Sequence, residues 1–130
     1  MKYGGKMQLV RLFLVFGALS TGAAALAHHS FAAEFLEDQT QTIEGTVTEV
    51  WFKNPHVRYY VDITTQDGAT ESWDVRGSSP TILVRRGWTP ETIKEGDVIK
   101  VHGHLGRDGR KLMQWIWVEL EDGTRLGSSY

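Results

Sequence analysis

Residues 44–63 read EGTVTEVWFKNPHVRYYVDI, and this stretch predicts two β-strands separated by a break. Apolar and polar residues alternate over Thr42–Phe52, as in a strand with one buried face. Asn54-Pro55 interrupts the pattern, because proline has no amide donor for a β-ladder and restricts the residue before it. The alternation resumes over His56–Thr64, where one face carries Val57, Tyr59, Val61 and Ile63. The stretch therefore predicts the first two strands of a β-domain.

The first of these strands changes its apolar face part-way along. Ile43 and Val47 lie on one face by parity, whereas Val50 lies on the other. An extra residue in one strand shifts the register and restores the apolar set to the buried side. We therefore expect a β-bulge near Thr48-Glu49.

A hairpin and then a change of period follow. Asp67-Gly68 is a strong hairpin signal, and Glu71–Arg76 returns as a third strand. Ser78-Ser79-Pro80 is typical of a helix start, because serine can cap a helix and proline fits its first turn. We expect a short helix over Thr81–Arg86, with Ile82 and Leu83 facing the core.

Two further strands complete the pattern. Val98–Leu105 predicts a fourth strand, and one of its faces carries Lys100, His102 and His104. Arg107–Arg110 predicts a hairpin turn that leads into a fifth strand over Lys111–Leu120.

The fifth strand is apolar on both faces. Parity places Trp115, Trp117 and Met113 together on one face. One aromatic row could therefore line a ligand groove, although core packing is the simpler interpretation.

Three strands, a helix and a further hairpin form the element order of the OB-fold, a partly open five-stranded barrel. We expect an all-β fold with little helix, namely an OB-like barrel with one short helix between strands three and four. A different small β-barrel is the alternative. The barrel domain is expected over residues 41–121, preceded by an N-terminal arm over 28–40 and followed by a flexible tail over 122–130.

Residues 1–27 have the three parts of a signal peptide. Lys2, Lys6 and Arg11 precede the apolar run Leu12–Leu19, and small residues then lead to a cleavage site after Ala27. An uncleaved membrane anchor is the competing interpretation, but the apolar stretch is shorter than the ~20 residues of a spanning helix. We expect cleavage and export to the periplasm or outside the cell, with no stable membrane insertion afterwards.

The composition of the exported part limits its partners. The chain has 14 Lys+Arg and 16 Asp+Glu, and removal of the three cations of the signal peptide leaves 11 against 16. This acidic balance argues against nucleic acid as a partner, because such binding depends on phosphate neutralisation. The chain has no cysteine, so any metal site must use nitrogen and oxygen ligands.

Four segments carry a resemblance to a known family. They are HHSFAAEF (28–35), the stretch 44–63, ESWDV (71–75) and RRGWTPETIKEGDVIKVHGH (85–104). Together they resemble a family of small exported bacterial proteins of unknown function, whose mature chains begin His-His-Ser-Phe and carry Asn-Pro-His after the first strand. The resemblance covers nearly the whole mature chain and implies an exported OB-like barrel without an established activity, cofactor or partner. Its motifs extend to His28, His29, Asn54, Pro55 and His56, and give little support for His102 or His104.

Five histidines make a metal site the most specific hypothesis. Cleavage after Ala27 would leave His28 with a free α-amine and a ring Nδ1, which together can chelate one ion. A third imidazole would complete an N₃ set suited to Cu(II), similar to the histidine brace of copper monooxygenases and of some periplasmic copper-binding proteins. The third ligand could be His56, or one of His102 and His104, which share a strand face.

Each histidine also has a structural interpretation. His28 and His29 fit exposed polar residues of the N-terminus, and His56 fits a loop residue that hydrogen-bonds a backbone carbonyl. His102 and His104 fit a solvated strand face, because Lys100 shares that face and repels cations.

Two functions fit these observations. The first is an exported protein that binds Cu(II) for buffering or delivery, with His28, His29, His56, His102 and His104 as candidate ligands. The alternative is a non-enzymatic OB-type binding module for a small molecule, peptide or protein partner in the periplasm. An oxidative copper enzyme is the least favoured class, because no substrate cleft is indicated.

Overall fold

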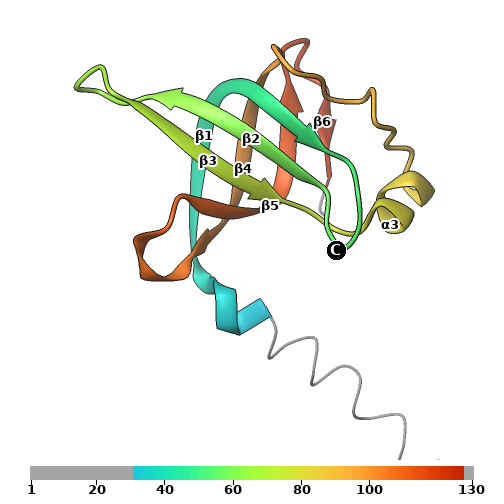
Figure 1. The fold of residues 1–130 in the computed structure, drawn as a ribbon, viewed down its shortest axis with the longest axis horizontal. Helices are drawn as coiled ribbons and strands as arrows, with labels where there is room; N and C mark the ends of the chain where they lie inside the picture. Colours follow the sequence, from blue (N-terminus) through green and yellow to red (C-terminus); the bar gives the residue numbers. More distant parts are fainter. Residues whose placement is uncertain (1–30, 128–130) are drawn as a thin grey trace, which may run out of the picture. The chain divides into compact units, whose positions relative to one another are not determined.

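The computed structural model describes residues 31–127, and their secondary structure is mostly β (Figure 1). The elements in chain order are β1 (Phe35–Trp51), β2 (Arg58–Thr64), β3 (Thr70–Arg76), α3 (Pro80–Arg85), β4 (Val98–Gly106), the 3₁₀-helix η1 (Arg107–Gly109), β5 (Leu112–Leu120) and β6 (Arg125–Leu126). None of the helices in this part of the chain has the length and apolar character that a membrane span requires.

The strands join in the order β3-β2-β1-β4-β5-β6. β5 also pairs in parallel with β3, through Asp74↔Leu112 and the two residues that follow on each strand. This last pairing closes a ring of five strands, and α3 lies between β3 and β4 in the chain. The OB-like architecture expected from the sequence is therefore confirmed.

The long strand β1 pairs with two neighbouring strands. Its first part pairs with β4 and its last part with β2. The register with β2 shifts between Val47 and Glu49, which confirms the predicted bulge. β1 also begins at Phe35, inside the expected N-terminal arm, because Phe35 pairs with Gly106 and Thr40 with His104. Residues 37–41 are all polar and do not alternate, so the sequence did not indicate a strand there.

The predicted hairpin and helix are present, with one error of orientation. Gly68 has φ +84° in the turn between β2 and β3, a conformation that glycine adopts at little cost. In α3 Leu83 is fully buried, whereas Ile82 is 42% exposed, so the expectation that both face the core is wrong for Ile82. A helix of six residues presents only one narrow face to the core.

A second bulge, in β5, changes the placement of its tryptophans. On β4, His102 pairs with Trp117 and the next residue, Gly103, pairs with Trp115, so Ile116 is the extra residue. Trp115 is fully buried, whereas Trp117 stacks on His102, on the other face of the sheet. The expectation that the two tryptophans share a face is therefore wrong, because the bulge reverses the parity of every residue after it.

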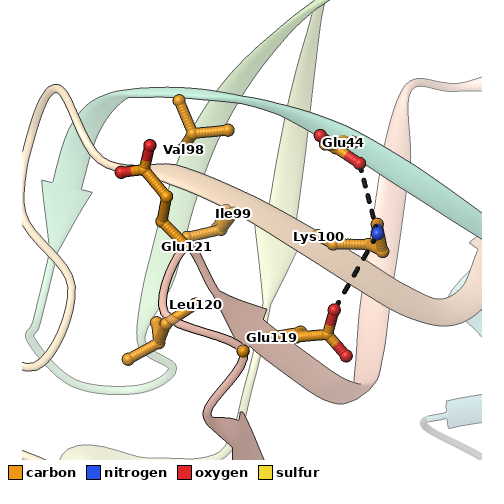
Figure 2. Close-up of a pocket in the computed structure, with 8 residues that line it drawn as sticks. Glu44, Val98, Ile99, Lys100, Glu119, Leu120 and Glu121 are labelled. Atoms are coloured by element: carbon orange, nitrogen blue, oxygen red, sulfur yellow. Dashed lines mark ion pairs between the residues drawn. The ribbon is translucent and has the colours of Figure 1, made fainter.

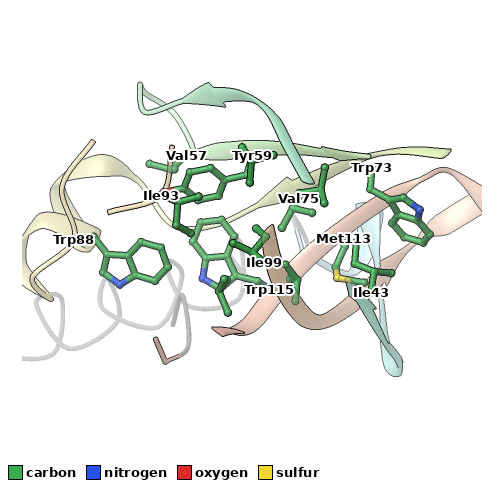
Figure 3. Close-up of a cluster of buried hydrophobic side chains, with 14 of the residues drawn as sticks. Ile43, Val57, Tyr59, Trp73, Val75, Trp88, Ile93, Ile99, Met113 and Trp115 are labelled. Atoms are coloured by element: carbon green, nitrogen blue, oxygen red, sulfur yellow. The ribbon is translucent and has the colours of Figure 1, made fainter. Parts of the chain in front are cut away.

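The core lies inside the ring and has Trp115 at its centre (Figure 3). The Trp115 ring lies 5.6 Å from the Tyr59 ring and 5.4 Å from the Trp88 ring, centroid to centroid. Beyond β5, Arg125 and Leu126 form β6 against Glu119 and Val118, within the stretch that we expected to be a flexible tail.

Candidate functional site

His56 is an exposed residue of the loop between β1 and β2. Its Nδ1 lies 3.1 Å from the carbonyl oxygen of Gly77. A carbonyl oxygen can only accept, so Nδ1 carries a proton, and in the neutral ring the lone pair is on Nε2. Metal-binding histidines commonly donate their second ring nitrogen to a carbonyl in this way, which fixes both tautomer and ring orientation. The hydrogen bond from His56 to a backbone carbonyl, expected if His56 has a structural role, is thus present. It leaves Nε2 able to coordinate a metal.

Gly77 holds this acceptor firmly in place. Its amide donates to the carbonyl of Val57 at 2.9 Å, and the Val57 amide donates to the carbonyl of Ser78 at 3.0 Å. A Cβ at Gly77 would lie 1.9 Å from Cη2 of Trp115. The carbonyl that orients His56 therefore belongs to a residue that packs directly on the core. The sequence alone did not indicate Gly77, because a glycine after a strand is ordinary unless its neighbours in space are known.

His102 is held on the outer face of β4. Its Nδ1 lies 3.0 Å from Oγ1 of Thr42, and its ring stacks on Trp117 at 5.4 Å and 19°. The guanidinium of Arg125 lies 4.0 Å from the centroid of the Trp117 ring and donates to Glu119 at 2.7 Å. That hydrogen bond holds the pKa of Glu119 below its usual range. These contacts favour a structural role for His102.

His104 is half-buried and follows His102 on the same face of β4. It lies opposite Thr40 of β1 and Gln114 of β5. The two histidines are thus brought to one strand face, as expected.

Lys100 occupies the same face and points toward acids (Figure 2). Its Nζ lies 3.4 Å from Glu44 and 3.8 Å from Glu119. These residues border a shallow pocket of about 220 Å³ that Val98, Ile99, Leu120, Glu121 and Gly123 also line. The pocket is lined by acids and aliphatic side chains and contains no tryptophan, so it is not the aromatic groove that the fifth strand suggested.

Within residues 31–127, no three histidine or acidic side chains come together to hold a metal ion. The expected ligands His28 and His29 lie outside the described residues. His56 is therefore the described histidine whose geometry best suits coordination.

The model of a family of unknown function, DUF6152, matches residues 17–114. The chain belongs to this family. The match to DUF6152 includes all five histidines and confirms the resemblance to an uncharacterised family. No curated protein matches the chain significantly.

Proposed function

We propose that this DUF6152 member is an exported protein that binds one Cu(II) ion for buffering or delivery. The α-amine and the ring nitrogen of His28 supply two ligands after cleavage at Ala27. One imidazole of the folded domain supplies the third. Three nitrogens without a thiolate suit Cu(II) better than Cu(I).

The observation that carries this proposal is the geometry of His56. Its ring is exposed, its Nδ1 is committed to the Gly77 carbonyl, and its Nε2 is an available donor. Among the described histidines, His102 is covered by Trp117 on one ring face and bonded to Thr42. His56 is therefore our choice for the domain's ligand.

The alternative binding module has less support. It relied on an aromatic face of β5, but Trp115 is fully buried in the core. Trp117 is stacked on His102 and lies against the guanidinium of Arg125.

The test is a Cu(II) titration of the processed protein, monitored by calorimetry and by electron paramagnetic resonance. We expect one Cu(II) per chain and the spectrum of a nitrogen-ligated ion. Acetylation of the α-amine of His28 removes the chelate and should abolish tight binding. His56→Ala should weaken binding by at least about a hundredfold, since even a partner in the outer shell of a metal site contributes 10- to 100-fold.

The matched control is His102→Ala, which removes an imidazole of the same sheet and should leave Cu(II) affinity unchanged. Equal Cu(II) affinity of the protein with a free and with an acetylated N-terminal amine would contradict the proposal.

A further inference from the structure

Three aspartates of this chain are followed directly by glycine, in the pairs Asp67-Gly68, Asp108-Gly109 and Asp122-Gly123. In such a pair the backbone amide of the glycine can attack the side-chain carboxyl carbon of the aspartate, because glycine has no side chain to hinder the approach. The protonated carboxyl reacts, since a carboxylate is a poor electrophile. The single asparagine, Asn54, precedes a proline, which has no amide hydrogen. The three pairs are therefore the positions where a chemical change of the main chain is most favoured.

Two of the three carboxylates are held in their turns by hydrogen bonds. Oδ1 of Asp67 accepts from Oγ1 of Thr65 and from the amide of Ala69, the latter at 3.4 Å. Oδ1 of Asp122 accepts from the amide of Thr124 at 2.8 Å. Because these bonds stabilise the charged form, they hold the pKa of Asp67 and of Asp122 below the ordinary range. Both the position and the charge of these two side chains therefore oppose attack by the next amide.

Asp108 differs from the other two aspartates. It is exposed in the connection between β4 and β5, which projects from the barrel in Figure 1. Within the described part of the chain its carboxylate accepts no hydrogen bond and forms no ion pair. Its backbone has φ 62° and ψ 25°, and no other described residue except glycine has a positive φ. This left-handed conformation is unfavourable for an L-residue, so Asp108 combines an unrestrained side chain with a strained main chain.

We propose that Asp108 is the position at which this protein converts to isoaspartate. The nitrogen of Gly109 forms a bond to Cγ of the protonated carboxyl, and the amide hydrogen leaves with the carboxyl hydroxyl as one water, which gives a five-membered succinimide. A water molecule then adds to one of the two ring carbonyl carbons. Addition at the main-chain carbon breaks its bond to nitrogen and leaves the chain running through Cγ, as isoaspartate. Addition at Cγ restores aspartate, so the reaction needs no oxidant, reductant or enzyme.

The product changes the main chain at a point that matters for the fold. Isoaspartate adds one backbone atom, so the chain no longer needs the left-handed conformation of Asp108. Residues Leu112–Gln114, shortly after this position, pair with β3 and close the ring of strands. The modification therefore lies just before the pairing that closes the barrel. It involves no histidine, so it is independent of the proposed copper site.

The test is prolonged incubation of the purified protein at neutral pH, followed by digestion with a protease that cleaves after lysine. Digestion places the three pairs in separate peptides, namely 54–94, 101–111 and 112–130. Liquid chromatography separates an isoaspartyl peptide from its aspartyl form of equal mass, and electron-transfer fragmentation locates the modified residue. We expect the isoaspartyl fraction of peptide 101–111 to exceed that of each other peptide several-fold.

Two substitutions at Asp108 test the chemistry. Asp108→Asn should form isoaspartate faster than the parent protein, because an uncharged amide is attacked more readily than a carboxylate. Asp108→Glu should form none in peptide 101–111, because the ring would need a sixth member. An Asp108→Asn protein that changes no faster than the parent would overturn the proposal.

The matched control releases a restraint at another pair. Thr65→Val removes the hydroxyl that donates to Asp67, so it should raise the isoaspartyl fraction of peptide 54–94 and leave peptide 101–111 as in the parent protein. Circular dichroism should show that every variant is folded. Equal isoaspartyl fractions in the three peptides of the parent protein, or a larger fraction in 54–94 or 112–130 than in 101–111, would also overturn the proposal.

Discussion

At the residue scale, Gly77 links the exposed candidate ligand to the core. Its carbonyl accepts from Nδ1 of His56, and its Cα packs where a Cβ would meet the ring of Trp115. A change in the core packing around Trp115 is therefore transmitted to the orientation of the His56 ring.

Gly77→Ala should both destabilise the protein and weaken copper binding. The added methyl cannot fit 1.9 Å from Cη2 of Trp115, and overpacking of this kind costs about 1–3 kcal/mol. Urea denaturation measures the loss. Gly127→Ala is the control, because a Cβ there would meet nothing within 4 Å. Equal stability of the Gly77→Ala and Gly127→Ala proteins would contradict this prediction, because it would show that the side chains around Trp115 rearrange to accommodate the methyl group.

Tyr59 predicts a stability change at alkaline pH. Its hydroxyl is buried, with no hydrogen-bond partner among the described residues, and burial raises the pKa of Tyr59 far above its ordinary value of 10.0. The folded state therefore keeps the neutral phenol, while the unfolded state ionises above about pH 10. This contribution to the free energy of unfolding is complete below pH 10 and is lost as the pH rises further.

Tyr59→Phe should remove that alkaline loss. At neutral pH it should leave the free energy of unfolding unchanged or raise it by up to about 2 kcal/mol, because an unpaired buried hydroxyl is removed. Denaturation at neutral and alkaline pH tests both statements, with Tyr60→Phe on the opposite face of β2 as the control. A neutral-pH loss larger than about 1 kcal/mol would mean that the hydroxyl of Tyr59 is hydrogen-bonded after all.

At the element scale, two bulges decide which side chains enter the core. The bulge in β1 could be predicted from parity. In a regular strand Ile43 and Val47 would lie on one face and Val50 on the other, so only an extra residue allows all three to face the core. The bulge in β5 could not, because that strand is apolar on both faces and either register buries apolar side chains. Tertiary pairing with His102 and Gly103 of β4 is what separates Trp115 from Trp117.

The two tryptophans of β5 should therefore differ strongly as alanine variants. Trp115→Ala leaves a cavity at the centre of the core and should cost about 3–5 kcal/mol. Trp117→Ala removes a half-buried ring with its contacts to His102 and Arg125, and should cost about 1–2 kcal/mol. Chemical denaturation of both variants measures the difference. Similar losses would indicate that the bulge does not place Trp117 outside the core.

At the scale of the whole molecule, the sequence predicted the five strands because four of them alternate, the fifth is a short apolar run, and turn or helix signals separate them. It did not predict the first part of β1, where polar residues pair with β4 without an alternating pattern. For the site, the sequence indicated His56 through the Asn-Pro-His motif, but not its tautomer. The tautomer depends on Gly77, 21 residues away in the chain, and only the fold brings them together.

Mass spectrometry of the exported protein, under native and denaturing conditions, tests the central claim most directly. We predict a denatured mass that begins at His28 and a native mass that contains one additional copper ion after equimolar Cu(II). A chain that begins at another residue, or a native mass without copper, would contradict the copper-binding account.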